Sequence, residues 1–464
     1  MRKVSGALIV HAAAAVLSLS STLPAVAGGD SGEDGGCCAS LDARVQALEA
    51  TTARKGNRFL SVEVSGLINE AVLGWDDGGE RNAYVVTNDN ARSRLRFVGS
   101  AEIARGWQAG FRLEAGVRSA NSKLVSQLGV TDRNNDKLDI RESVWFVKSD
   151  RFGTGFIGTT FPSFTNIADA NLTQTDWFAK YGGVENTGLS MFLRSANNGR
   201  LSRTITWRRM IGAGGDQPDE SQRGFTLIKY MSPTWNGFTA GASLVGDDFW
   251  DVSLRYRGNV GDVAVAAGIG YLNLVPGSRS KGVCALTLFV SGEDATKCNQ
   301  LYGSFSVLHQ PTGLFLNFGS GLTVQGLLDD TRRFDGTGVD DSELFWAGQA
   351  GIERRFNALG KTTLYGELYR YSGGAPTGLP VLPGDALNPT GLGTWTVWQS
   401  DMTAVGGGIA QGIDAAAMIL YLAYRHVEGD VTLRQLQGLT ASGPLAGAPI
   451  DDLDLVLGGA IVNF

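Results

Sequence analysis

Residues 94–118 read RLRFVGSAEIARGWQAGFRLEAGVR, and this stretch decides the fold. Arginine, serine, glutamate and glutamine recur at alternate positions, and the positions between them carry mainly leucine, phenylalanine, alanine, isoleucine or valine. A period of two is typical of a β-strand with one wet face and one apolar face. Residues 104–106, Ala-Arg-Gly, predict a tight turn between the two runs. We therefore expect a β-hairpin, and the same alternation returns in residues 251–257.

Connection lengths separate a soluble sandwich from a membrane barrel, because strands alternate in both. Tight turns are predicted near residues 104–106, 150–152, 233–237, 258–261, 311–313, 357–360 and 412–414. Longer links lie at 75–91, 120–138, 162–223, 274–300, 326–342, 373–400 and 428–452, with one short link at 246–248. Outer-membrane barrels alternate in this way between tight periplasmic turns and long outer loops. Residues 58–464 are therefore predicted to be all-β, a 16-stranded antiparallel transmembrane β-barrel around an aqueous lumen.

The composition agrees with such a barrel and disfavours other functions. Mean hydropathy is −0.03, as expected when every strand has one apolar and one wet face. No segment reaches the roughly 18 consecutive apolar residues of a membrane-spanning helix. The net charge of −6 argues against a nucleic-acid partner. With three histidines in the chain we expect no metal, no cofactor and no catalytic centre, and hence no enzyme.

The N-terminal 57 residues are predicted to lie outside the barrel. Residues 1–27 have the basic start, short apolar run and small-residue cleavage site of a signal peptide, which predicts export. Residues 28–57 continue as an acidic, Gly-rich spacer and a short helix. Its seam of Leu41, Val45 and Leu48 has coiled-coil spacing. A coiled coil between chains and a solvated linker helix both remain open, as does a tether to the envelope through this helix.

The cysteines form two pairs in the sequence. Cys284 and Cys298 are candidates for a disulfide across an outer link, because an exported protein meets an oxidising compartment. Cys37 and Cys38 are adjacent, and a bond between them would be strained, so links between chains are the alternative.

Several segments resemble the alphaproteobacterial general porins. They are CCASLDARVQALEATTARKGNR at 37–58, SGLINE at 65–70, RLRFVG at 94–99, WFVKS at 145–149 and GTGFIG at 153–158. The terminal Phe464 resembles the signal read by the barrel assembly machinery of the outer membrane. The resemblance implies a homotrimer among outer-membrane lipids and lipopolysaccharide that passes small hydrophilic solutes and ions by diffusion. It also implies that the link 162–223 folds inside the barrel as a constriction loop.

A diffusion channel needs a wet bore and an electric field. Basic residues on the strands are predicted to face the bore, because a charge on the lipid face costs about 2–4 kcal/mol at mid-depth. These pore-lining candidates are Arg92, Arg94, Arg96, Arg112 and Arg255. The constriction loop supplies Asp169, Asp176 and Glu185, which are expected to oppose them, and also Lys180, Arg194 and Arg203. The loop is net basic, which predicts modest anion preference or weak selectivity, although many loop arginines are equally expected on the outer surface.

Aromatic side chains support two further expectations. The aromatic residues near predicted tight turns favour an interfacial girdle, and they are Trp107, Phe152, Trp235, Phe238, Phe356 and Phe464. Tyr365, Tyr369 and Tyr371 share one face of a strand. If that face looks inward, it resembles the aromatic slide of a channel that prefers sugars or another nutrient.

Overall fold

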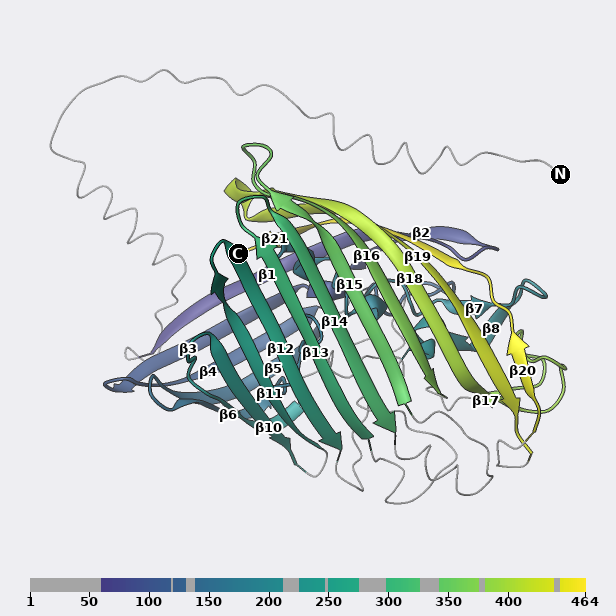
Figure 1. The fold of residues 1–464 in the computed structure, drawn as a ribbon, viewed down its shortest axis with the longest axis horizontal. Helices are drawn as coiled ribbons and strands as arrows, with labels where there is room; N and C mark the ends of the chain where they lie inside the picture. Colours follow the sequence, from purple (N-terminus) through teal and green to yellow (C-terminus); the bar gives the residue numbers. More distant parts are fainter. Residues whose placement is uncertain are drawn as a thin grey trace. The chain divides into compact units, whose positions relative to one another are not determined.

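The computed structural model describes residues 60–117, 120–130, 138–211, 225–246, 249–274, 298–325, 342–374, 380–437 and 443–464. Within these ranges sixteen long strands form a closed antiparallel ring, so the predicted barrel is confirmed (Figure 1). None of the described helices has the length and apolarity needed to cross a bilayer. The signal peptide, the coiled-coil seam of Leu41, Val45 and Leu48, and Cys284 lie outside the described residues.

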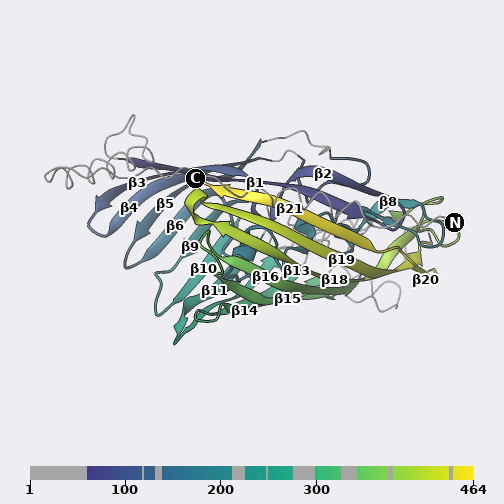
Figure 2. The ribbon, with the colours of Figure 1, turned by 90° about the horizontal axis from the view of Figure 1, so that it is seen from above.

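The ring follows the chain order, and each strand pairs with the one before it. Its members are β1 Ser61–Asp76, β3 Arg94–Ala104, β4 Trp107–Val117, β5 Leu138–Ser149, β6 Gly153–Thr160, β9 Phe225–Met231, β10 Phe238–Val245, β11 Phe249–Val260, β12 Val263–Leu274, β13 Cys298–His309, β14 Leu314–Gln325, β15 Ser342–Arg354, β16 Thr362–Gly374, β18 Trp395–Ile413, β19 Met418–Gln435 and β21 Leu453–Asn463. The pairing of β21 with both β19 and β1 closes the ring (Figure 2).

Short elements extend the links at one rim. The strands are β2 Arg81–Thr87, which pairs with β1, β17 Pro380–Val381, β20 Leu445–Ala448, and the hairpin of β7 Phe192–Arg194 with β8 Leu201–Thr206. The 3-10 helices are η1 Asp89–Ala91, η2 Gln174–Trp177, η3 Val184–Asn186, η4 Trp207–Met210 and, in the turn after β18, η8 Asp414–Ala416. In Figure 1 the hairpin, β2, β17 and β20 all lie toward the end of the barrel opposite to the C-terminus.

The two rims differ as the connection lengths predicted. All seven predicted tight turns join neighbouring strands at one rim, and the first strand starts at that rim. The chain also ends there, where Gly66 and Phe464 exchange backbone hydrogen bonds with N–O distances of 2.9 and 3.1 Å. An even number of strands returns the chain to the rim from which it started.

The strand faces alternate between an apolar outside and a mixed interior. On β19, Leu420 and Leu422 are exposed on the outer face, whereas Tyr421 and Arg425 are buried inside. The side chains expected in the girdle are all exposed on the surface of the barrel, and they are Trp107, Phe152, Trp235, Phe238, Phe356 and Phe464. An apolar outer face has a suitable environment in hydrocarbon, and the aromatic rings at its edge suit the interface.

An infolded segment of the chain lies inside the ring, within the link that the resemblance implied would fold there. Residues 161–211, which include the described part of the link 162–223, pack against the inner faces of β12–β16, β18, β19 and β21. Phe164, Phe178, Leu189 and Trp207 belong to a hydrophobic core between this segment and the wall. The close approach requires glycine, since a Cβ at Gly319 would lie 2.1 Å from the carbonyl oxygen of Ala168.

A second close approach occurs at the closing seam and gives a stability prediction. A Cβ at Gly66 would lie 2.4 Å from the carbonyl oxygen of Arg94 and 2.6 Å from the ring of Phe464. Gly66→Ala is expected to lower the free energy of unfolding by about 1–3 kcal/mol, as overpacking does. The control is Gly155→Ala in β6, where the added Cβ meets nothing within 4 Å. Urea titration of the refolded barrel measures both, and equal stability of the two variants would contradict the prediction.

Candidate functional site

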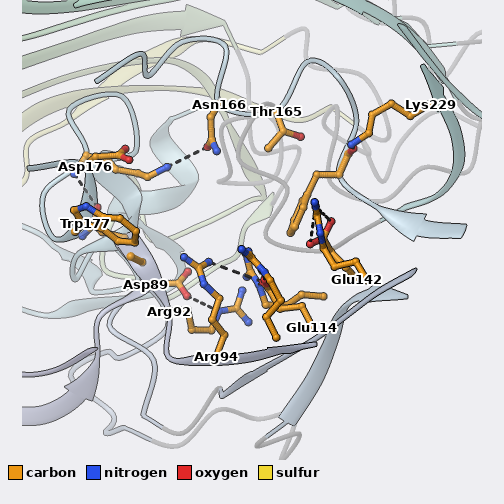
Figure 3. A pocket seen from close by; sticks show the side chains of 17 residues that line it. Asp89, Arg92, Arg94, Glu114, Glu142, Thr165, Asn166, Asp176, Trp177 and Lys229 are labelled. Atoms are coloured by element: carbon orange, nitrogen blue, oxygen red, sulfur yellow. Dashed lines mark hydrogen bonds and ion pairs between the residues drawn. The ribbon is translucent and has the colours of Figure 1, made fainter. Parts of the chain in front are cut away.

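A cavity of about 330 Å³ lies between the strands β3–β5 and β9 and the infolded segment (Figure 3). We call it the charged hollow. Its cationic side chains are Arg92, Arg94, Arg96, Arg112, Arg141, Lys180 and Lys229, and its carboxylates are Asp89, Glu114, Glu142 and Asp176. Figure 3 shows Asp176 and Trp177 of the segment across the hollow from Glu142. Four of the five predicted pore-lining arginines therefore lie at this one place.

A fully buried carboxylate, that of Glu114, organises one part of the hollow. Arg96 Nε donates to Glu114 Oε2 at 2.6 Å, and Arg141 Nε donates to Glu114 Oε1 at 2.6 Å. Arg94 Nη1 approaches the same carboxylate less closely, at 4.0 Å. Three guanidinium groups thus share one negative charge. Arg141 and Glu114 occupy neighbouring strands, β5 and β4, at a β-bulge that follows Glu114.

Glu142 organises the adjacent part of the hollow. Arg112 Nη1 donates to Glu142 Oε1 at 3.2 Å, and Thr160 Oγ1 donates to the same atom at 2.7 Å. Lys229 Nζ donates to the carbonyl oxygen of Phe161 at 2.7 Å. The sequence analysis did not name Arg141, Glu142 or Lys229 as pore-lining residues. For Arg141 and Glu142 the reason is the bulge, which turns two successive residues of β5 inward.

Arg92 differs from the other arginines because it does not lie on a strand. It follows η1, in an inward excursion between β2 and β3. Its guanidinium is buried, 3.0 Å from Asp89 Oδ1 and 3.0 Å from Asp139 Oδ2. These pairs compensate its charge more fully than that of Arg94.

Only one of the three loop acids expected to oppose the arginines lines the hollow, and that residue is Asp176. Asp169 lies 3.5 Å from Lys180 and accepts a hydrogen bond from the backbone of Gly182. Glu185 is buried 3.7 Å from Lys123. The pair of Asp169 with Lys180 lies within the infolded segment, and the pair of Glu185 with Lys123 joins that segment to the link after β4, so neither acid lines the hollow.

Three basic residues that the sequence analysis assigned to the pore or its constriction loop do not line the hollow. Arg255 donates to the carbonyl oxygens of Ser163 and Thr165, at 3.0 and 2.5 Å, and so holds the base of the infolded segment. Arg194 lies on the β7–β8 hairpin, where it makes two hydrogen bonds to Asp77 at 3.0 and 2.9 Å. Arg203, on the same hairpin, is exposed.

Aromatic packing holds the infolded segment on the wall. Phe178 stacks on Tyr421 with ring centroids 4.8 Å apart and meets the edge of Tyr365 at 6.0 Å. The Asn88 side chain joins the same cluster by donating to the Phe178 carbonyl and to the Tyr421 hydroxyl. Tyr365, Tyr369 and Tyr371 do face inward, but they are buried. They therefore do not line the hollow as an aromatic slide.

The Asp77–Arg194 pair fixes the hairpin, outside the spanning strands. Burial by itself would raise the pKa of Asp77, but hydrogen bonds from Arg194, Gln127 and backbone amides outweigh it and lower that pKa. Burial likewise disfavours charge on Arg194, and the hydrogen bond to Asp77 overcomes this and raises the pKa of Arg194. Both groups are therefore charged at neutral pH.

A closed barrel with a charged hollow beside an infolded segment defines a channel-forming protein of the outer membrane. The chain belongs to the Gram-negative porin family, whose model matches residues 12–432. It is an outer-membrane porin, and its family and fold indicate a channel rather than an enzyme. None of the curated protein sequences matches the chain.

Solved structures of outer-membrane proteins are similar to this chain at low sequence identity. The anion-selective porin from Comamonas acidovorans is 15% identical, with a TM-score of 0.51, over 87% of this chain and 100% of that one. OmpT folded in vitro, an outer membrane protein of Vibrio cholerae, is 12% identical, with a TM-score of 0.48, over 88% and 99%. Salmonella typhi OmpF in complex with daunomycin is 10% identical, with a TM-score of 0.47, over 89% and 100%.

Phe178→Ala is expected to loosen the infolded segment, because truncation of a buried phenylalanine removes about 3–5 kcal/mol of packing. Single-channel recording should show a larger and noisier conductance than in the wild type. Phe356→Ala, which truncates an exposed phenylalanine at a tight turn, is the control and should leave the conductance unchanged. An unchanged conductance in a folded Phe178→Ala barrel would show that this packing does not set the width of the bore.

The Asp77–Arg194 pair predicts a pH dependence of the hairpin. Because folding depresses the pKa of Asp77, its stabilisation is complete above the unfolded pKa of about 4 and is lost as the pH falls through the folded pKa. Hydrogen exchange of residues 192–206, corrected for intrinsic rates, should be slow at pH 7 and faster in strong acid. Asp77→Asn should exchange fast at both values. Equal protection of the wild type at both would contradict this mechanism.

Proposed function

We propose that the protein is an anion-preferring diffusion porin for small hydrophilic solutes and ions. The observation that carries the proposal is the excess of positive charge at the hollow, which is lined by seven cationic side chains and four carboxylates. Low-dielectric walls focus the field of such an excess and raise the local concentration of counter-ions. Anions are therefore expected to enter the hollow more readily than cations of similar size.

The arrangement of charge also supports an effect on dipolar solutes. The arginine cluster around Glu114 lies on β3–β5, whereas Asp176 belongs to the infolded segment. A solute between them experiences a field across the bore, because most of the positive charge is on one side. Such a field orients dipolar solutes during passage and favours those that align.

The ion preference is tested by reversal potentials in planar bilayers under a potassium chloride gradient. The wild type should show an anion-selective potential, and Arg94→Gln combined with Arg112→Gln should lower the chloride-to-potassium permeability ratio. Arg203→Gln also removes one positive charge, but from an exposed position outside the hollow, and should keep the wild-type ratio. A wild-type potential of zero or of cation-selective sign would refute the anion preference.

The sequence supports further proposals on assembly. We propose that the chain is an alphaproteobacterial general porin, that residues 1–27 are cleaved on export, and that the barrel assembly machinery reads Phe464. The mature protein forms a homotrimer among outer-membrane lipids and lipopolysaccharide. Three equal conductance steps in the same bilayers measure the trimer. The tether role of residues 28–57 and the disulfide between Cys284 and Cys298 stay predictions from the sequence alone.

A sugar-preferring channel has less support than an ion-selective one. Its sequence basis was the shared face of Tyr365, Tyr369 and Tyr371. Tyr365 packs against Phe178 and Tyr369 against Phe345, and the Tyr371 ring is buried. A ring already covered on its faces offers little surface to a passing sugar.

A further inference from the structure

The cations of the charged hollow are unequally compensated. Arg96 and Arg141 each lie within 2.6 Å of Glu114, and Arg92 lies between Asp89 and Asp139. Arg94 has a single ion pair among the described residues, at 4.0 Å, with the carboxylate that Arg96 and Arg141 already occupy. Its guanidinium is also repelled by those two arginines and by Arg92. Arg94 thus retains most of its charge and donors for another partner.

Arg112 and Lys229, in the part of the hollow next to Glu142, also have charge or donors that their partners do not fully use. Arg112 uses Nη1 on Glu142, but its Nε is buried without a hydrogen-bond partner among the described residues. Lys229 Nζ bonds a carbonyl oxygen, and no carboxylate lies within ion-pair distance of it in the part of the chain that the structure describes. The carboxylates of Glu142 and Asp251 attract Lys229 from a distance, and Arg112 and Arg255 repel it. A buried donor without a partner is costly, so a ligand that supplies an acceptor gains free energy there.

We infer that the hollow contains a binding site for doubly charged oxyanions, inorganic phosphate or sulfate, with Arg94, Arg112 and Lys229 as its donors. Planar guanidinium groups match the oxygen atoms of such anions, and an ammonium group adds a compact charge. A second negative charge doubles the attraction, which separates these ligands from chloride. Glu114 and Glu142 oppose the anion, but both are held by their own arginines and Thr160. The inference rests on the proposed anion preference and makes it specific to a class of solute.

The site gives the channel two regimes. Chloride passes as a weakly held ion, whereas a retained phosphate or sulfate occupies the narrow passage and obstructs other ions until it leaves. Conduction through such a site requires binding strong enough for entry and weak enough for release. The carboxylates of Glu114 and Glu142 serve that balance by lowering the net charge around the donors.

The test is inhibition of chloride current through the full-length porin in planar bilayers. Sodium phosphate at pH 8 or sodium sulfate is added at constant ionic strength, with sodium gluconate as the singly charged comparison. The wild type should be inhibited by phosphate and sulfate but not by gluconate. Arg94→Gln or Lys229→Gln should raise the half-inhibiting concentration by about tenfold, the effect of losing one hydrogen bond to a charged group. Arg203→Gln, which removes an exposed charge, should behave as the wild type.

Reversal potentials recorded in the same membranes separate this inference from the proposed function. An anion-selective wild type that neither phosphate nor sulfate inhibits overturns the oxyanion site and leaves the anion preference standing. Inhibition that both hollow variants retain at the wild-type concentration also overturns the site. A wild-type reversal potential that shows no anion selectivity refutes the proposed function itself. Weaker inhibition in either hollow variant, with Arg203→Gln unchanged, supports the site even if the other variant fails to fold.

Discussion

The backbone hydrogen bonds that join β21 to β1 are the constraint on which the structure depends. A strand edge cannot remain open in hydrocarbon, because an unpaired N–H or C=O group there has no water to bond. The register from Leu67 with Asn463 to Asp76 with Asp454 pairs both edges along most of β1. Closure in turn creates an inside, and only an inside lets Arg94, Arg96 and Arg112 lie on membrane strands away from lipid.

Inside the ring, two kinds of interaction divide the space. Apolar packing around Phe178 and Trp207 attaches the infolded segment to the wall opposite the arginines, and no water is needed there. Electrostatic repulsion within the arginine strands prevents the same collapse on the other side, because their charges need solvent or counter-ions. The hollow is the boundary between these two regions. Its position therefore follows from which strands carry leucine and tyrosine inward and which carry arginine.

The sequence predicted the ring well and the contacts within it poorly, for physical reasons. Period-two alternation and turn residues are local signals, so the strands, the seven tight turns and the inward arginines were accessible from them. The partners of those arginines were not. Glu142 and Arg141 both point inward because of a bulge, which breaks the period. Asp169 and Glu185 looked free to oppose the arginines, but Lys180 and Lys123 hold them, and such pairs depend on how distant segments fold together.

Because of the infolded segment, the width of the passage no longer depends only on the number of strands in the barrel. In an empty barrel the number of strands fixes the diameter of the passage. Here the segment between Phe161 and Ile211 also takes up space inside the ring, while the sixteen strands and their lipid-facing surface stay the same. Selection can therefore change the solutes that a cell admits by altering residues that never touch the bilayer. For the same reason the barrel suits engineering as a nanopore, since its aperture can be redesigned without rebuilding its frame.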